Sequence, residues 1–149
     1  MADRALPVVL LLYCAASLLH FWHNAEYVAD YPNLPRWITE ASVYATWAAI
    51  GLVGLTGYLL FRQRHTMVGL SLLAVYAAFG FDGLLHYTRA PMSVHTVSMN
   101  VTIWAEVITA GLALSVVAWL AYRPDPLVTA QATRPRRRDD HRSRLLRHP

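Results

Sequence analysis

The sequence predicts an all-α protein, an integral membrane four-helix bundle followed by an arginine-rich tail. Hydrophobic residues make up 56% of the chain, and they fall into four blocks close to the roughly 20 residues that cross a bilayer core. Polar or proline-containing segments separate these blocks. We expect a single membrane domain over 1–122, a disordered basic tail over 123–149, and four spans near 5–23, 37–61, 66–86 and 97–122.

The first block resembles a secretory signal peptide in some features. The small residues Ala15, Ala16 and Ser17 would suit a cleavage site. However, the apolar character continues past them to Trp22, and three more blocks follow. We therefore expect this segment to remain as the first helix.

The second span is separated from the first by a loop with Pro32 and Pro35, which disfavour helix in the residues before them. Three glycines in this span should allow a neighbouring helix to approach closely: Gly51, Gly54 and Gly57. A short basic turn at 62–65 leads to the third span, and Arg123 with Pro124 ends the fourth.

Arginine alone sets the expected orientation, because the chain contains no lysine. Arg62, Arg64 and the arginines after the fourth span lie on one side together with Arg4, whereas only Arg36 and Arg89 lie on the other. The positive-inside rule then places both termini in the cytoplasm. We expect a bacterial inner (cytoplasmic) membrane protein whose loops after spans one and three face outward.

The end of the first span carries the most unusual residues. Taken as a helix at about 100° per residue, it places His20, His23, Tyr27 and Asp30 on one stripe, with Glu26 at its edge. Ionisable groups are costly in a membrane segment and usually have a function there. This segment therefore marks a candidate site.

The third and fourth spans bring matching groups to the same level. Asp82 and His86 are four residues apart, so they share one face of the third helix. His95 enters from the outer loop or from the first turn of the fourth helix, and Glu106 lies roughly 15 Å inside by the helical rise. An isolated charge at that depth is costly, so Glu106 should be protonated, hydrogen-bonded or facing water.

His95 and four residues of the fourth span repeat at spacings of four, three, four and three, which places them on one narrow and mostly polar face: His95, Met99, Thr102, Glu106 and Thr109. On the second span Glu40, Tyr44 and Trp47 repeat this spacing. The simplest packing turns one polar stripe of each helix toward a shared interior.

Imidazole and carboxylate groups at one membrane level suit Zn, Fe, Cu or Mn, and the single cysteine excludes a multi-cysteine site. The candidate ligands are His20, His23, Asp82, His86, His95 and Glu106. Our leading hypothesis is an outward-facing His/carboxylate site that binds a transition metal. It would serve metal handling, or metal-dependent chemistry on a lipid-soluble substrate, and the sequence does not choose between these.

Other functions fit the same residues. Haem b could be held between an imidazole of the first span and one of the third or fourth, for electron transfer. A cofactor-free accessory or assembly subunit would instead turn its stripes to a membrane protein partner or to a second copy. A proton or ion pathway through Glu106 is a further variant, and interhelical hydrogen bonding explains a lone intramembrane histidine without any cofactor. Phosphate-loop, dinucleotide-binding, zinc-protease and nucleophile-elbow motifs are absent.

The basic tail predicts contact with lipid. Its densest run, at 134–138, can lie on anionic lipid headgroups at about 1 kcal/mol per basic residue. Nucleic-acid binding ranks lower, because no folded basic module accompanies the run.

Overall fold

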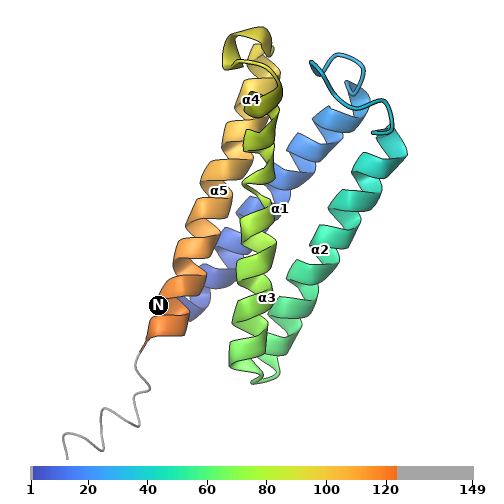
Figure 1. Ribbon diagram of the computed structural model, residues 1–149. Coiled ribbons are helices and arrows are strands. Elements are labelled where there is room, and N and C mark those ends of the chain that lie inside the picture. The colour runs from blue at the N-terminus through green and yellow to red at the C-terminus, as the bar shows by residue number, and fades with distance from the viewer. Residues whose placement is uncertain (1, 124–149) are drawn as a thin grey trace, which may run out of the picture.

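The computed structural model of the chain describes residues 2–123 (Figure 1). The basic tail was expected over 123–149, and its residues 124–149 lie outside the described part of the chain. The described chain consists of helices without a strand: α1 (Ala2–Glu26), α2 (Glu40–Arg62), α3 (Thr66–Phe79), the 3₁₀ turn η1 (Asp82–Leu85), α4 (His86–Arg89), the 3₁₀ turn η2 (Met92–Val94) and α5 (Val97–Tyr122). The prediction of an all-α fold is confirmed.

Four stretches of the described chain are long and apolar enough to cross a membrane: Ala5–Glu26, Glu40–Arg62, Thr66–Arg89 and Val97–Tyr122. This is consistent with an integral membrane protein. Side chains that face outward along these helices are largely apolar, such as Leu11, Leu52, Val68 and Ile108, all more than half exposed. Such a surface is typical of a bundle that packs its small and polar residues inside.

The helices pack in two close pairs, α2 with α3 and α1 with α5, and α3 also packs against α5. Helices α1 and α2 also pack together, over a smaller contact than these three pairs. Figure 1 shows the start of α1, the α2–α3 turn and the end of α5 at one end of the bundle, which we call the short-turn end. The loops at 27–39 and 90–96 lie at the opposite end, the long-loop end.

Helix α2 begins at Glu40, three residues later than expected, because a capping box sets its start. The Thr39 hydroxyl accepts from the Ser42 backbone N–H at 3.3 Å, and the Ser42 hydroxyl oxygen accepts from the Thr39 N–H at 2.9 Å. These bonds satisfy two backbone donors that a helix start leaves free. Trp37 precedes the cap and is 76% exposed.

Helix α1 ends at Glu26, so the predicted continuation of its polar stripe to Tyr27 and Asp30 is wrong. The Asp30 N–H donates to the Tyr27 carbonyl at 2.9 Å, a bond over three residues that replaces helical pairing with a turn. Tyr27 and Asp30 are exposed. The turn brings Tyr31 back against the bundle, where it is only 3% exposed.

The third span is not one continuous helix as expected, because α3 ends at Phe79 and η1 begins at Asp82. At the break the Gly80 N–H donates to the Ala77 carbonyl at 3.1 Å and the Phe81 N–H to the Ala78 carbonyl at 3.2 Å. These tighter turns redirect the chain before Asp82.

Two contacts account for the position of the break. A Cβ added at Gly80 would lie 2.5 Å from Ala110 Cβ and 2.6 Å from a ring carbon of Tyr13, so only glycine allows α1, α3 and α5 to meet here. The Tyr13 hydroxyl donates to the Tyr76 carbonyl at 3.0 Å. This carbonyl would otherwise remain unpaired where α3 ends.

Glycine also sets the α2–α3 crossing toward the short-turn end. A Cβ at Gly69 would lie 2.5 Å from the Phe61 backbone nitrogen and 2.8 Å from the Gly57 carbonyl oxygen. Gly54 and Gly57 are buried, as the sequence predicts for a close-packing face, whereas a Cβ at Gly51 would meet nothing within 4 Å.

Candidate functional site

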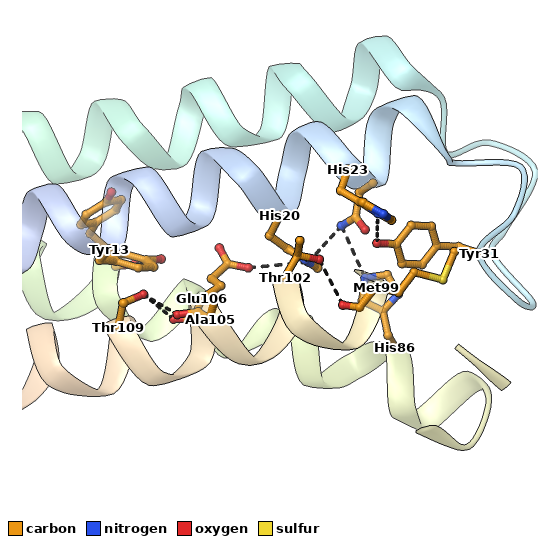
Figure 2. Close-up of polar contacts among 12 residues, drawn as sticks. Tyr13, His20, His23, Tyr31, His86, Met99, Thr102, Ala105, Glu106 and Thr109 are labelled. Atoms are coloured by element: carbon orange, nitrogen blue, oxygen red, sulfur yellow. Dashed lines mark hydrogen bonds and ion pairs between the residues drawn. The ribbon is translucent and has the colours of Figure 1, made fainter. Parts of the chain in front are cut away.

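Buried polar side chains gather toward the long-loop end of the bundle, between α1, α5 and the segment after the α3 break. The buried polar and charged side chains of the described residues are Ser17, His20, His23, His95, Thr102 and Glu106. Figure 2 shows His20, Thr102 and Glu106 pointing toward one another between α1 and α5, with His86 and Tyr31 farther toward the long-loop end. We call His20, Asn24, Asp82, His86, His95 and Glu106 the polar cluster.

The contacts of Thr102 are the basis on which we assign the tautomer of His20. The Thr102 hydroxyl donates to the Met99 carbonyl at 3.0 Å, and its oxygen lies 3.3 Å from His20 Nδ1. Because the hydroxyl hydrogen is used by the carbonyl, the oxygen accepts from a His20 Nδ1–H. A neutral imidazole carries one N–H, so His20 Nε2 presents a lone pair.

This Nε2 lone pair faces three other members of the polar cluster. Asn24 Nδ2 lies 3.0 Å from His20 Nε2 and 3.5 Å from His86 Nε2, so one amide group bridges two imidazoles. The two ring centroids are 5.6 Å apart. Glu106 Oε2 approaches His20 Nε2 to 3.6 Å, which is longer than a hydrogen bond.

Glu106 is 1% exposed, and neither of its carboxyl oxygens has a hydrogen-bond partner. Gly83 lies beside the gap between Glu106 and His20. A Cβ added at Gly83 would lie 3.6 Å from His20 Nε2 and 3.7 Å from Glu106 Oε2, both ordinary contact distances. Gly83 therefore leaves a methyl-sized space beside the two side chains.

His95 also pairs its Nδ1 with a backbone carbonyl, in this case directly and without an intervening hydroxyl group. Its Nδ1 lies 3.2 Å from the Pro91 carbonyl oxygen, which can only accept, so Nδ1 carries the hydrogen. His95 Nε2 is buried without a partner, and the ring lies 6.2 Å from that of His86 between centroids.

His23 differs, because both of its ring nitrogens are paired with hydroxyl groups. Nδ1 lies 3.0 Å from the Tyr31 hydroxyl and Nε2 lies 3.2 Å from the Ser98 hydroxyl. Burial raises the pKa of the Tyr31 hydroxyl, so this group keeps the hydrogen that it can donate. His23 therefore has no free lone pair in this arrangement.

The unpartnered atoms are confined to the polar cluster. Within residues 2–123 the buried side-chain atoms without a hydrogen-bond partner are Asn24 Oδ1, Asp82 Oδ1, His95 Nε2, Glu106 Oε1 and Glu106 Oε2. Buried polar groups are nearly always satisfied by protein, water or a ligand. A hydrogen-bond donor or a cation bound at the polar cluster would therefore satisfy these acceptor atoms.

The six predicted site residues do not form one centre. In the described part of the chain, no three His, Cys, Asp or Glu side chains are placed so that they could hold a metal ion together. His20 and Glu106 are adjacent, His86 joins them through Asn24, and His95 is next to His86. Asp82 lines the same pocket as His20 and His86, whereas His23 pairs elsewhere.

The prediction that α2 turns Glu40, Tyr44 and Trp47 to a shared polar interior is wrong for Glu40, whereas Tyr44 and Trp47 are partly buried and pack against the hydrophobic core. Glu40 is exposed, and the Tyr44 hydroxyl donates to Glu26 Oε1 at 3.2 Å on the bundle surface. The residues that α2 does bury are Val43, Ile50, Gly54 and Gly57. A helical repeat identifies residues that share a face, but it does not show which neighbour that face meets.

A pocket of about 280 Å³ opens beside the polar cluster, between α1, α2 and the η1–α4 segment. His20, Asn24, Asp82 and His86 form its polar side, and Arg89 also lines it. A pocket with a few convergent polar groups is the usual form of a small-molecule site.

Sequence reasoning missed three contributors to this site. Asn24 is four residues after His20, so the shared helix face could have identified it. Gly83 and Tyr31 gave no such signal, because the α3 break and the turn after α1 place them.

Comparison with protein-family models, with curated proteins and with solved structures finds no match to this chain.

Proposed function

We propose that this chain is an integral membrane protein that binds a transition-metal ion at His20, Glu106 and His86. The observation that carries the proposal is the contact of His20 Nδ1 with the Thr102 hydroxyl, which itself pairs with the Met99 carbonyl; we assign the ring hydrogen to Nδ1 on this basis. Histidines that bind metals almost always donate their other ring N–H to a carbonyl, a carboxylate or water, which leaves the free nitrogen for the ion. His95 shows the same arrangement directly on the Pro91 carbonyl.

The His20 and Glu106 atoms are spaced for one small ion, whereas His86 has to move to join them, because no three such side chains stand together in the described residues. Two ligand atoms bound to one tetrahedral zinc at 2.0–2.1 Å are roughly 3.3 Å apart, and His20 Nε2 and Glu106 Oε2 are 3.6 Å apart. His86 Nε2 is reached through the Asn24 amide, which lies within 3.5 Å of both imidazole nitrogens. Rotation of the Asn24 side chain would let His86 approach the ion as a third ligand.

Asp82 and His95 are the further candidate ligands in this proposal. Each carries a buried acceptor atom without a partner, so each can bind the ion or hydrogen-bond to a ligand on it. Imidazole with carboxylate suits Zn, Fe, Cu or Mn. The ion would serve metal handling, or metal-dependent chemistry on a lipid-soluble substrate.

We propose that this site lies on the outer side of the membrane. The support for this is the positive-inside rule, by which Arg62, Arg64 and Arg123, against Arg36 and Arg89, favour a cytoplasmic position for both termini in a bacterial cell. The long-loop end then faces outward, and the arginines of the tail would lie on anionic lipid headgroups.

Metal titration of the purified protein in mild detergent tests the proposal. We expect near-stoichiometric binding of Zn, Cu, Fe or Mn, and a loss of affinity of at least about tenfold in His20→Ala. His65→Ala is the matched control, because His65 is exposed at the short-turn end. Equal affinity in wild type, His20→Ala and His65→Ala would overturn the proposal.

An optical spectrum of the same sample separates the ion from haem b. One amide nitrogen bridges His20 and His86, which favours a single ion over a macrocycle between the two rings. A Soret band in protein expressed with ample haem would replace the proposed ion with haem.

A further inference from the structure

The end of α4 is tied to the loop after α1 at the pocket beside the polar cluster. The Asn33 side-chain amide donates to the Arg89 carbonyl at 2.9 Å, and Asn33 has φ 59°, a left-handed conformation that asparagine adopts more readily than most residues. Leu34 and Trp37 follow in the same loop and line the pocket together with Arg89. We call Leu34, Trp37 and Arg89 the mouth of the pocket, because Trp37 and Arg89 are exposed. The bond to Asn33 fixes the backbone from which the Arg89 side chain extends.

Arg89 carries the only permanent positive charge among the residues that line this pocket. Within residues 2–123 its guanidinium group forms neither an ion pair nor a hydrogen bond, since its one bond is that of the backbone carbonyl. The hydroxyl groups of Ser42 and Thr46 also line the pocket, but they donate to the carbonyls of Thr39 and Ser42. A guanidinium group pairs best with a phosphate or a carboxylate. The mouth therefore suits an anionic head group.

The acid of the pocket lining, Asp82, lies deeper than the mouth. It begins η1 seven residues before Arg89, which places it roughly 10 Å farther along the third span by the helical rise. That separation is about one Debye length at physiological salt. An anion bound at Arg89 is therefore attracted by the arginine far more than it is repelled by Asp82.

Beyond the mouth, two cavities lie along the contact between α1 and α2. The pocket itself continues past Ile38 and Val43 to Thr46. A second cavity of about 290 Å³ follows between the same helices, with Leu11, Gly51 and other largely apolar residues in its lining. A Cβ added at Gly51 would meet nothing within 4 Å. We call the two cavities together the α1–α2 groove.

The depth of this groove matches one lipid chain. Half of a hydrocarbon core that is about 30 Å thick corresponds to about ten residues of helix. Counted along α2 from Ser42, a chain from the leaflet at the long-loop end reaches Gly51. An apolar chain is the occupant that a bilayer offers to such a groove, and the charge at its mouth selects the head group.

We propose that the α1–α2 groove binds one anionic phospholipid, with its phosphate on Arg89 and one acyl chain along Val43 and Gly51. A zwitterionic lipid would fill the apolar part equally well, but it would add a second positive charge beside Arg89. The proposal goes beyond metal binding and does not depend on an ion, because Arg89 is not a proposed ligand.

Lipid binding to Arg89→Gln and Arg36→Gln tests the head-group assignment. Arg36 is exposed in the loop at the same end of the bundle, but it does not line the pocket. Native mass spectrometry of the full chain, titrated with phosphatidylglycerol or with phosphatidylcholine of the same chains, gives the affinity for the first lipid. Wild type should prefer phosphatidylglycerol by about fivefold, the expected effect of one arginine at the membrane surface.

Arg89→Gln should lose this preference, and Arg36→Gln should retain it. The Asn33 bond goes to the backbone of residue 89, so it remains in the variant. Arg89→Lys keeps the charge and should keep most of the preference. The tail arginines are present in every variant, so the difference between variants reports on Arg89 alone. Equal preference for phosphatidylglycerol in Arg89→Gln and Arg36→Gln would overturn the proposal.

A groove-filling variant tests the position of the acyl chain. Gly51 lines the second cavity, whereas Ala49 is exposed on the same helix and lies outside the lining of both cavities. Gly51→Phe should weaken binding of both lipids by about tenfold, the effect of displacing about two methylene groups, with Ala49→Phe close to wild type. Equal lipid affinity in the two folded variants would refute the chain assignment.

Discussion

In the short-turn half of the bundle, α2 and α3 meet almost backbone to backbone through Gly57 and Gly69, and Leu70 and Leu73 fill the space beside them. In the long-loop half the third span breaks at Gly80, and buried acceptor atoms stand without partners. Both halves use glycine, but for different purposes. Gly57 and Gly69 bring two helices together in the first half, whereas Gly83, beyond the close contact at Gly80, leaves space beside His20 and Glu106 in the second. The comparison separates the residues that hold the fold from those that form the site.

Disrupting the short-turn half should have the largest effect. Gly69→Ala places a methyl group 2.5 Å from the Phe61 backbone nitrogen, and a backbone contact cannot relax as a flexible side chain can. We expect a loss of about 3 kcal/mol in stability, measured by thermal unfolding in detergent. Gly51→Ala is the control, since its methyl meets nothing within 4 Å and alanine favours helix. Equal stability of the two variants would show that this crossing is looser than described.

Removing the Glu106 carboxyl group, in the long-loop half, should raise the stability of the protein rather than lower it. Glu106→Leu deletes two buried oxygens that have no hydrogen-bond partner, so we expect a gain of about 2 kcal/mol in stability together with loss of metal binding. Glu40→Leu, at an exposed acid of α2, should give no such gain. A strong destabilisation by Glu106→Leu would mean that the carboxyl group is paired in the folded protein.

The hydrogen bond at the boundary between the halves should have a smaller effect. Tyr13→Phe removes the donor to the Tyr76 carbonyl at the α3 break. The expected loss in stability is about 1 kcal/mol. Tyr58→Phe serves as a control, because the Tyr58 hydroxyl accepts from Arg62 at the surface and pairs with no backbone carbonyl of the described residues. Similar melting temperatures for both variants would argue that the break does not depend on this bond.

The α2–α3 turn should give the smallest change. Arg64 has φ 71°, in the left-handed region that favours glycine. Arg64→Gly should stabilise the protein by about 0.5 kcal/mol. Gln63→Gly, at a residue with φ −82°, should instead cost stability. Any loss in Arg64→Gly would show that the arginine side chain contributes more than its backbone conformation costs.

The fold follows from the sequence because apolar length is a local property. The buried face of α5 also follows, since the spacing of Met99, Thr102 and Glu106 is helical and all three are buried. The α3 break does not follow, because it depends on Tyr13 and Ala110, which are distant in sequence. Contacts of this kind decide where a helix ends and are invisible to periodicity.

The sequence predicted which types of residue form the candidate site, but not how their side chains pair. His20 and Glu106 come together because they face each other across the α1–α5 contact. The pairing of His23 with Tyr31 depends on the turn that ends α1 at Glu26, which the sequence predicted as helix. Which histidine keeps a free lone pair follows from its hydrogen-bond partners, and these required the structure.

Metal titration of Gly83→Ala against wild type tests the central claim most directly. Its methyl group would lie 3.6 Å from His20 Nε2 and 3.7 Å from Glu106 Oε2, so it fits without clash but occupies the space proposed for the ion. We predict an unchanged melting temperature with metal affinity reduced at least about tenfold. Wild-type metal affinity in Gly83→Ala would contradict the claim that the ion binds between these two side chains.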